Sequence, residues 1–138
     1  MALTGSLLLV DDEEEFVQIL LRRFERRGME VVVCLDHQTA IDAVLQRPFD
    51  VVLLDRKLGR FDGVNLARDV KRSDASMQVL MLSGYNDPDS IDEARAAGVD
   101  EYLVKPCALS RLETAVEEAL RRGRSQRDGT GLLVTSIH

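Results

Sequence analysis

Four apolar runs in this chain of 138 residues each end in side chains that can do chemistry. The first run ends in Asp11 and Asp12, the second in Asp55, and two more in Ser83 and Lys105. Three carboxylates in one small space cannot all stay ionised unless a cation joins them or a proton is taken up. Because hard divalent ions prefer oxygen ligands, the three acids predict an Mg²⁺ site.

An aspartate beside such an ion can take part in phosphoryl chemistry. A carboxylate can attack phosphorus to form an acyl phosphate, and the metal screens charge between nucleophile and donor. Lys105 would supply fixed positive charge, and the Ser83 hydroxyl would donate a hydrogen bond to a phosphoryl oxygen. A lysine or serine at the end of a strand is ordinarily just a solvated residue. The ordered set of acids, hydroxyl and lysine is what favours phosphoryl transfer.

Other site classes lack their signatures. A nucleotide phosphate needs amide donors from a glycine- or hydroxyl-rich loop, whereas residues 11–15 are all acidic. The chain has neither a G-x-x-x-x-G-K-S/T nor a G-x-S-x-G motif. Its histidines, His37 and His138, fall in a loop and at the terminus, so they give no support for a Ser-His-acid triad.

The elements that must position these residues alternate between strand and helix patterns. Strands are predicted at residues 6–10, 30–34, 50–54, 78–82 and 101–104. The first two helices should face inward with Phe16, Ile19, Leu20, Phe24, Ala40, Ile41, Val44 and Leu45. Asp87-Pro88 marks the start of the fourth helix. We expect residues 59–63 to form a loop and the last helix to end near Gly123.

Five strand–helix repeats predict an α/β fold, a flavodoxin-like doubly wound sheet of five parallel strands with five helices. In the strand order 2-1-3-4-5, strands one and three flank the point where the order reverses. Ligands bind at such points, beyond the carboxyl ends of the strands. Since Asp11, Asp12 and Asp55 end strands one and three, the fold and the acids predict the same site.

At this point the sequence resembles the receiver domain of two-component response regulators, over roughly residues 6–122. The motifs are Val10-Asp11-Asp12, Leu54-Asp55, Asp62-Gly63, Leu82-Ser83-Gly84 and Tyr102-Leu103-Val104-Lys105-Pro106. The resemblance implies that Asp55 accepts a phosphoryl group from a sensor histidine kinase or a phosphotransfer protein. It also implies that Asp12, Asp55 and the backbone carbonyl of Lys57 bind Mg²⁺ directly, with Asp11 acting mainly through water.

The resemblance further implies a switch. Ser83 would be the switch hydroxyl, Tyr102 the switch aromatic and Lys105 the phosphoryl contact, with a cis bond before Pro106. On phosphorylation the face formed by helix four, strand five and helix five would repack to control a partner or output domain. Such a domain is a signalling module that phosphorylates and dephosphorylates itself with Mg²⁺, and not an enzyme in the usual sense.

Two positions tune dephosphorylation in that family, and here they hold Lys57 and Tyr85. A bulky Tyr85 would hinder the attacking water, so we expect slow self-dephosphorylation. The loop after the acceptor often contains Met-Pro in the family, whereas this chain has Leu58-Gly59, and glycine makes the loop more flexible.

The receiver domain is expected to span residues 5–122, and residues 123–138 are expected to be a flexible tail or a truncated linker. No DNA-binding, cyclase or ATPase domain follows, so the output is unknown and the chain is either stand-alone or cut from a longer protein. A phosphorylation-dependent homodimer is an option. One family subgroup dimerises through a salt-bridge pattern that Arg111 and Ala115 do not fit.

Composition narrows the remaining classes. A formal charge of −6 argues against direct nucleic-acid binding. No apolar run approaches the roughly 20 residues of a membrane helix, and no secretory signal is apparent. The cysteines, Cys34 and Cys107, have no framework spacing and are interpreted as reduced thiols of a cytoplasmic protein.

Two alternatives remain open. The first is a degenerate receiver that acts as an unphosphorylated interaction module, against which the intact acids, Ser83 and Lys105 argue. The second is an aspartate-nucleophile phosphatase, which also uses Mg²⁺ and an acyl phosphate. Such enzymes typically place a general acid two residues after the nucleophile, where Lys57 stands here.

Overall fold

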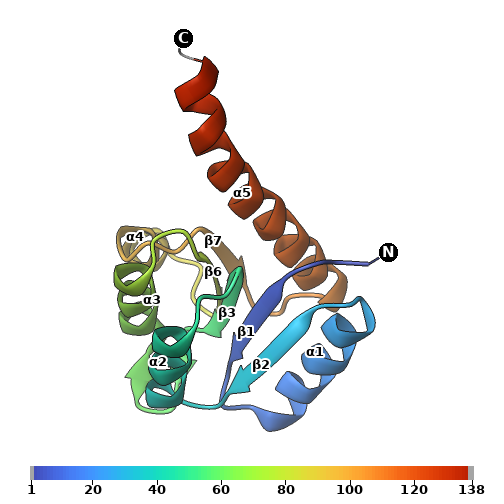
Figure 1. Ribbon diagram of the computed structural model, residues 1–138. Helices are drawn as coiled ribbons and strands as arrows, with labels where there is room; N and C mark the ends of the chain where they lie inside the picture. The colour runs from blue at the N-terminus through green and yellow to red at the C-terminus, as the bar shows by residue number, and fades with distance from the viewer. Residues whose placement is uncertain (1, 137–138) are drawn as a thin grey trace.

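The computed structural model describes the backbone of residues 2–136 and the side chains of residues 2–125. Its main sheet has five parallel strands in the order β2-β1-β3-β6-β7. The strands are β1 (Ser6–Val10), β2 (Glu30–Cys34), β3 (Val51–Asp55), β6 (Gln78–Ser83) and β7 (Glu101–Val104). Counted along the chain, these are strands 2-1-3-4-5, which confirms the predicted doubly wound order (Figure 1).

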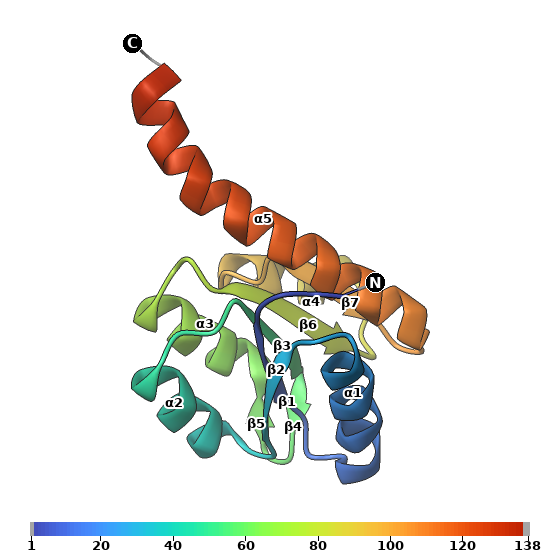
Figure 2. The same cartoon turned by 45° about the vertical axis from the view of Figure 1, so that its right-hand side comes forward.

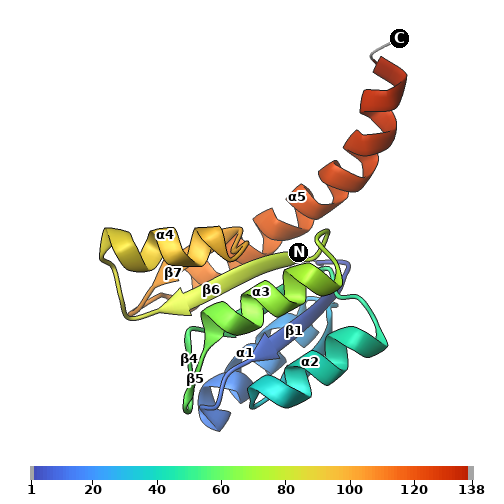
Figure 3. The same cartoon turned by 90° about the vertical axis from the view of Figure 1, so that its left-hand side faces the viewer.

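Helices cover both faces of the sheet. On one face lie α1 (Glu14–Arg26) and α5 (Leu109–Ser136), and on the other α2 (His37–Gln46), α3 (Gly63–Ser73) and α4 (Pro88–Ala96). Figure 3 shows the second face, with α2, α3 and α4 in front of the strands. Helices α1 to α4 are crossovers between parallel strands, and they reach both faces because the strand order reverses after β2.

Two separate cores result, because successive strand residues point to opposite faces. Leu8, Val10, Val52 and Leu54 pack with the buried side chains of α2, α3 and α4. Their neighbours in sequence pack on the other side with α1 and α5; this second core includes Leu7, Leu9, Val51, Leu53, Phe24 and Leu112. Strands β1 and β3 are thus apolar on both faces, as expected for central parallel strands.

Aspartate side chains cap the starts of α3 and α4. Asp87 accepts a hydrogen bond from the amide of Ser90 at 3.0 Å, and Pro88 occupies the first turn, as the sequence predicts. Asp62 likewise caps α3 through the amide of Val64 at 2.9 Å. The starts of α3 and α4 at the carboxyl edge of the sheet are therefore fixed locally.

The segment predicted as a loop after β3 is a small hairpin. It consists of β4 (Lys57–Leu58) and β5 (Phe61–Asp62), at the carboxyl end of the main sheet (Figure 2). Gly59 adopts a φ of 61° at its turn, a conformation that glycine reaches without strain. A side chain on Gly63 would meet the carbonyl oxygen of Asp55 at 2.4 Å, so only glycine fits where α3 begins.

The last helix does not end near Gly123 as predicted, but continues to Ser136 (Figure 1). Each glycine costs a helix about 1 kcal/mol relative to alanine, and α5 crosses Gly123, Gly129 and Gly131. Helix propensity therefore does not account for the extension. The division into a domain of residues 5–122 and a tail of residues 123–138 stays a prediction, and residues 137–138 lie outside the described part.

Two inward-facing predictions were wrong. Ile19 is 45% exposed and Leu45 is 70% exposed. In α1 the buried stripe runs through Val17, Leu20 and Phe24, and Ile19 lies beside it. Over the described residues, no helix combines the length and apolarity needed to cross a membrane.

Candidate functional site

Asp11 and Asp55 meet at the carboxyl ends of β1 and β3, which pair in register from Leu7 with Val51 to Val10 with Leu54. Both side chains are buried. Carboxylate oxygens of Asp11, Glu13 and Asp55 all lie within 4.8 Å of one another. The acidic cluster at the reversal of strand order is therefore present, and it is open to solvent on the side of the exposed Glu13.

The surroundings of Asp11 favour the protonated form of its carboxyl group. Its pKa rises to about 7, chiefly because burial penalises the charged form and also because Asp55 is close. The backbone amide of Glu13, which donates to Asp11 Oδ1 at 2.9 Å, and the charge of Lys105 oppose this rise only in part. Such a carboxyl holds a proton near neutral pH unless another cation takes its place.

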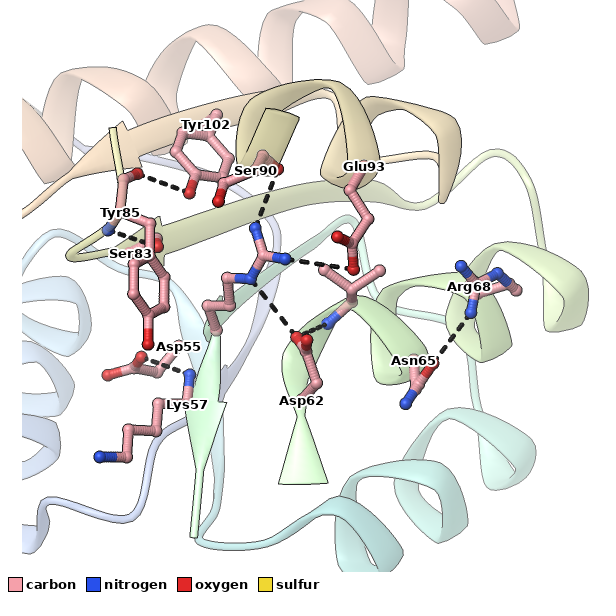
Figure 4. A network of polar contacts seen from close by, with 12 residues as sticks. Asp55, Lys57, Asp62, Asn65, Arg68, Ser83, Tyr85, Ser90, Glu93 and Tyr102 are labelled. Carbon is pink, nitrogen blue, oxygen red and sulfur yellow. Dashed lines mark hydrogen bonds and ion pairs between the residues drawn. The ribbon is translucent and has the colours of Figure 1, made fainter. Parts of the chain in front are cut away.

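Asp55 has a cation of its own. Lys105 Nζ lies 2.5 Å from Asp55 Oδ2. The amide of Lys57 donates to Oδ1 at 2.9 Å (Figure 4). Burial acts to lower the pKa of Lys105, but its hydrogen bond to Asp55 and the charges of Asp55 and Asp11 outweigh burial, so the pKa is raised. Lys105 therefore stays charged and faces the carboxylate.

Glu13 belongs to the acidic cluster, although no site role was predicted for it from the sequence. Asp12, predicted as a direct ligand, is exposed and accepts a hydrogen bond from the amide of Gly59 at 3.0 Å. Its carboxylate is thereby turned toward the hairpin. The run of acids at residues 11–15 was the available signal for Glu13, because it places a further carboxylate beside strand one.

The predicted switch residues form one network around Tyr85. Ser83 is buried at the end of β6, and its Oγ accepts a hydrogen bond from the amide of Tyr85 at 3.0 Å. The hydroxyl of Tyr102 donates to the carbonyl oxygen of Tyr85 at 2.7 Å. Figure 4 shows Ser83, Tyr85 and Tyr102 side by side near Asp55. Through Tyr85, the hydroxyl and the aromatic residue are linked.

A cavity of about 450 Å³ opens beside the acids. Glu13, Phe16, Leu82, Lys105, Pro106 and Cys107 line it. The bond between Lys105 and Pro106 is cis. A ligand in this space would reach Lys105 from the solvent side.

The fold and the site together define a class: a doubly wound domain with an acid cluster, a hydroxyl and a lysine at the ends of its strands. The family model of the response regulator receiver domain matches residues 7–117. The chain therefore belongs to that family, the receiver domains of two-component signal transduction.

Relatives agree with this assignment. The transcriptional activator protein PfeR of Pseudomonas aeruginosa is 36% identical over 121 residues, which cover 88% of this chain and 39% of PfeR. NtrX from Brucella abortus has a solved structure that superposes with a TM-score of 0.85 at 26% identity, covering 94% of this chain and 30% of that one. A two-component response regulator from Clostridium difficile gives 0.79 at 26% identity, covering 85% and 96%.

The chain spans only part of its curated relatives, 39% of PfeR and 27% of the transcriptional regulatory protein ZraR of Klebsiella oxytoca. It is a receiver domain homologous to transcriptional response regulators. Receivers of this family signal through phosphorylation of an aspartate by histidine kinases.

Proposed function

We propose that Asp55 is the phosphoacceptor of this receiver and that a sensor histidine kinase or a phosphotransfer protein is its donor. The observation that carries the proposal is the setting of Asp55, a buried carboxylate at the switch point with Lys105 Nζ at 2.5 Å. A carboxylate oxygen would form the new O–P bond as the P–N bond of a phosphohistidine breaks. The leaving imidazole nitrogen keeps the bonding pair and takes up a proton.

Mg²⁺ is the proposed cofactor, with Asp12, Asp55 and the backbone carbonyl of Lys57 as its direct ligands and Asp11 acting mainly through water. Clustered carboxylates, one of them with a pKa raised to about 7, suit a hard divalent ion. When bound, the ion would screen the charge between the carboxylate and the phosphodonor. Glu13 lies close enough to contribute an oxygen, directly or through water.

Side chains of this chain would then contact the phosphoryl group and change position in response to it. Lys105 would transfer its contact from Asp55 to a phosphoryl oxygen, and the Ser83 hydroxyl would turn from the amide of Tyr85 toward it. Tyr102 would move with Tyr85, because its hydroxyl is bonded to that residue's carbonyl. The face of α4, β7 and α5 would change as a result.

The output of this switch is a partner protein or an output domain. We propose no direct nucleic-acid contact by this chain, in line with its net charge of −6. A phosphorylation-dependent homodimer is the second proposed consequence of the switch. In the described structure, the guanidinium of Arg111 lies 2.5 Å from the carboxylate of Glu101 in the same chain, so dimer contacts there would compete with an internal ion pair.

The proposed location is the cytoplasm. The free cysteines Cys34 and Cys107 fit this location.

The direct test is incubation with Mg²⁺ and acetyl phosphate, followed by intact-mass measurement. Wild type should gain one phosphoryl group only when Mg²⁺ is present in the reaction, and Asp55→Asn should gain none. Asp42→Asn, which alters an exposed acid on α2, is the matched control and should behave as wild type.

Other outcomes point to the alternatives. No modification, together with no spectral change on adding beryllofluoride, would favour an unphosphorylated interaction module. Sustained turnover of small phosphomonoesters would favour an aspartate-nucleophile phosphatase.

A further inference from the structure

Arg56, the residue directly after Asp55, is a buried arginine that reaches across to α4. Its side chain is only 8% exposed, although arginine is ordinarily a surface residue. Nη1 donates a hydrogen bond to the carbonyl oxygen of Ser90 at 2.9 Å, and Nη2 lies 3.2 Å from Glu93. Nε lies 3.5 Å from Asp62 of β5. Figure 4 shows these three partners converging from two elements.

Helix α4 has few other attachments to the body of the domain. Of its residues only Ala94 is buried. By contrast, α3 buries five: Gly63, Val64, Leu66, Ala67 and Val70. Because burial of apolar side chains is the main force that docks a helix, the polar contacts of Arg56 hold an unusually large share of α4.

Arg56 also contacts the aromatic residues of the switch network. Its guanidinium carbon lies 5.8 Å from the ring centroid of Tyr85. Burial acts to lower the pKa of Arg56, but the hydrogen bond with Tyr102 and the charges of Asp62 and Glu93 outweigh burial, so the pKa is raised. The guanidinium therefore stays charged in a site that its partners fill.

We propose that Arg56 is a positioning residue that ties α4 to the backbone of the phosphoacceptor, so that a change at Asp55 is passed to α4 through this guanidinium. The inference rests on the proposed function of Asp55. A guanidinium is planar and donates in fixed directions, so its acceptors must keep their relative positions. Any shift of the segment after Asp55 must then move α4 or break these contacts.

Hydrogen–deuterium exchange of α4 in the unmodified protein tests the tie. Arg56→Met keeps the length of the side chain but removes every donor. The amides of residues 91–97 should exchange on the order of tenfold faster in this variant, because local opening of α4 becomes easier. Arg68→Met is the matched control: Arg68 donates to Asn65 at 2.9 Å on the exposed face of α3, and its loss should leave α4 unchanged.

A second measurement tests whether Arg56 passes a change at Asp55 on to α4 or only holds α4 in place. Mg²⁺ and beryllofluoride are added, binding is followed by fluorine NMR, and the exchange of α4 is compared with and without the mimic. Wild type should show a change in α4 when the mimic binds. Arg56→Met should bind the mimic with an affinity within about threefold of wild type, a difference of under 1 kcal/mol, yet lose most of the change in α4.

Either of two results would overturn the proposal: wild-type exchange of α4 in Arg56→Met, or a full response of α4 to the bound mimic in that variant. If wild type fails to bind the mimic, the proposed function fails, and the metal-free comparison still decides whether Arg56 holds α4. If Arg56→Met does not fold, Glu93→Ala removes one of the three acceptors and should speed the exchange of α4 by a smaller factor; Glu93 is 56% exposed, so its loss spares the core.

Discussion

The raised pKa of Asp11 predicts that Mg²⁺ binding displaces a proton. In the metal-free protein this carboxyl titrates with a pKa of about 7, because it is buried beside Asp55. Asp11 must be deprotonated to help hold Mg²⁺, directly or through a bound water, so binding below pH 7 requires the proton to leave. Changing the pH therefore changes both the affinity for Mg²⁺ and the number of protons released.

The magnitude follows from that pKa. At pH 6 about nine tenths of the Asp11 side chains carry a proton, and at pH 8 about one tenth do. Each Mg²⁺ bound should release about 0.9 proton at pH 6 and about 0.1 at pH 8. The apparent affinity should rise about tenfold between the two, or about 1.4 kcal/mol, and level off above pH 8.

Calorimetric titration with Mg²⁺ in two buffers of different ionisation enthalpy measures the released protons directly. Asp11→Asn is the control, and its binding, weaker in affinity, should release almost none at pH 6. The carboxyl carbon shift of Asp11 in the metal-free protein gives the same pKa independently. Release near zero from wild type at pH 6, or an Asp11 midpoint near pH 4, would refute the reasoning.

Three further predictions concern single side chains. Tyr85→Ala should lose its phosphoryl group several-fold faster than wild type, about 1 kcal/mol in barrier, because the ring hinders the attacking water; slower loss, followed by intact mass after donor removal, contradicts this. Gly63→Ala should lower the free energy of unfolding in urea by about 1–3 kcal/mol, since its Cβ meets a backbone oxygen at 2.4 Å. Gly84→Ala, with nothing within 4 Å, should cost far less, and equal losses would be inconsistent with this account. Phe24→Ala, fully buried, should cost about 3–5 kcal/mol, whereas Leu45→Ala, 70% exposed, should change stability by under about 0.5 kcal/mol in the same assay.

The sequence was sufficient to predict the fold and the neighbourhood of the site. Strand ends can be read from apolar runs, and parallel topology brings those ends to one edge. The positions of Asp55, Ser83 and Lys105 at that edge follow from this alone. The ligand roles, the phosphoacceptor role of Asp55 and the tuning roles of Lys57 and Tyr85 stay predictions.

The directions in which the site side chains point could not be predicted from the sequence. Asp12 and Glu13 are adjacent acids in one loop, and only the folded backbone decides that Glu13 joins Asp11 while Asp12 turns to Gly59. The hairpin after β3 is too short to show an alternating pattern. Arg56 gave no signal either, because an arginine after a strand looks like a surface residue until α4 is placed over it.

The sheet separates the two cores, so side chains packed in one core share no neighbours with side chains packed in the other. Substitutions that share no neighbours usually add in free energy to within about 0.5 kcal/mol. A cavity made at Leu112 and one made at Val64 lie in different cores, so their costs should simply sum, while pairs within one core should not. The side that carries α1 and α5 can thus drift in sequence or be redesigned without disturbing the packing beneath α4.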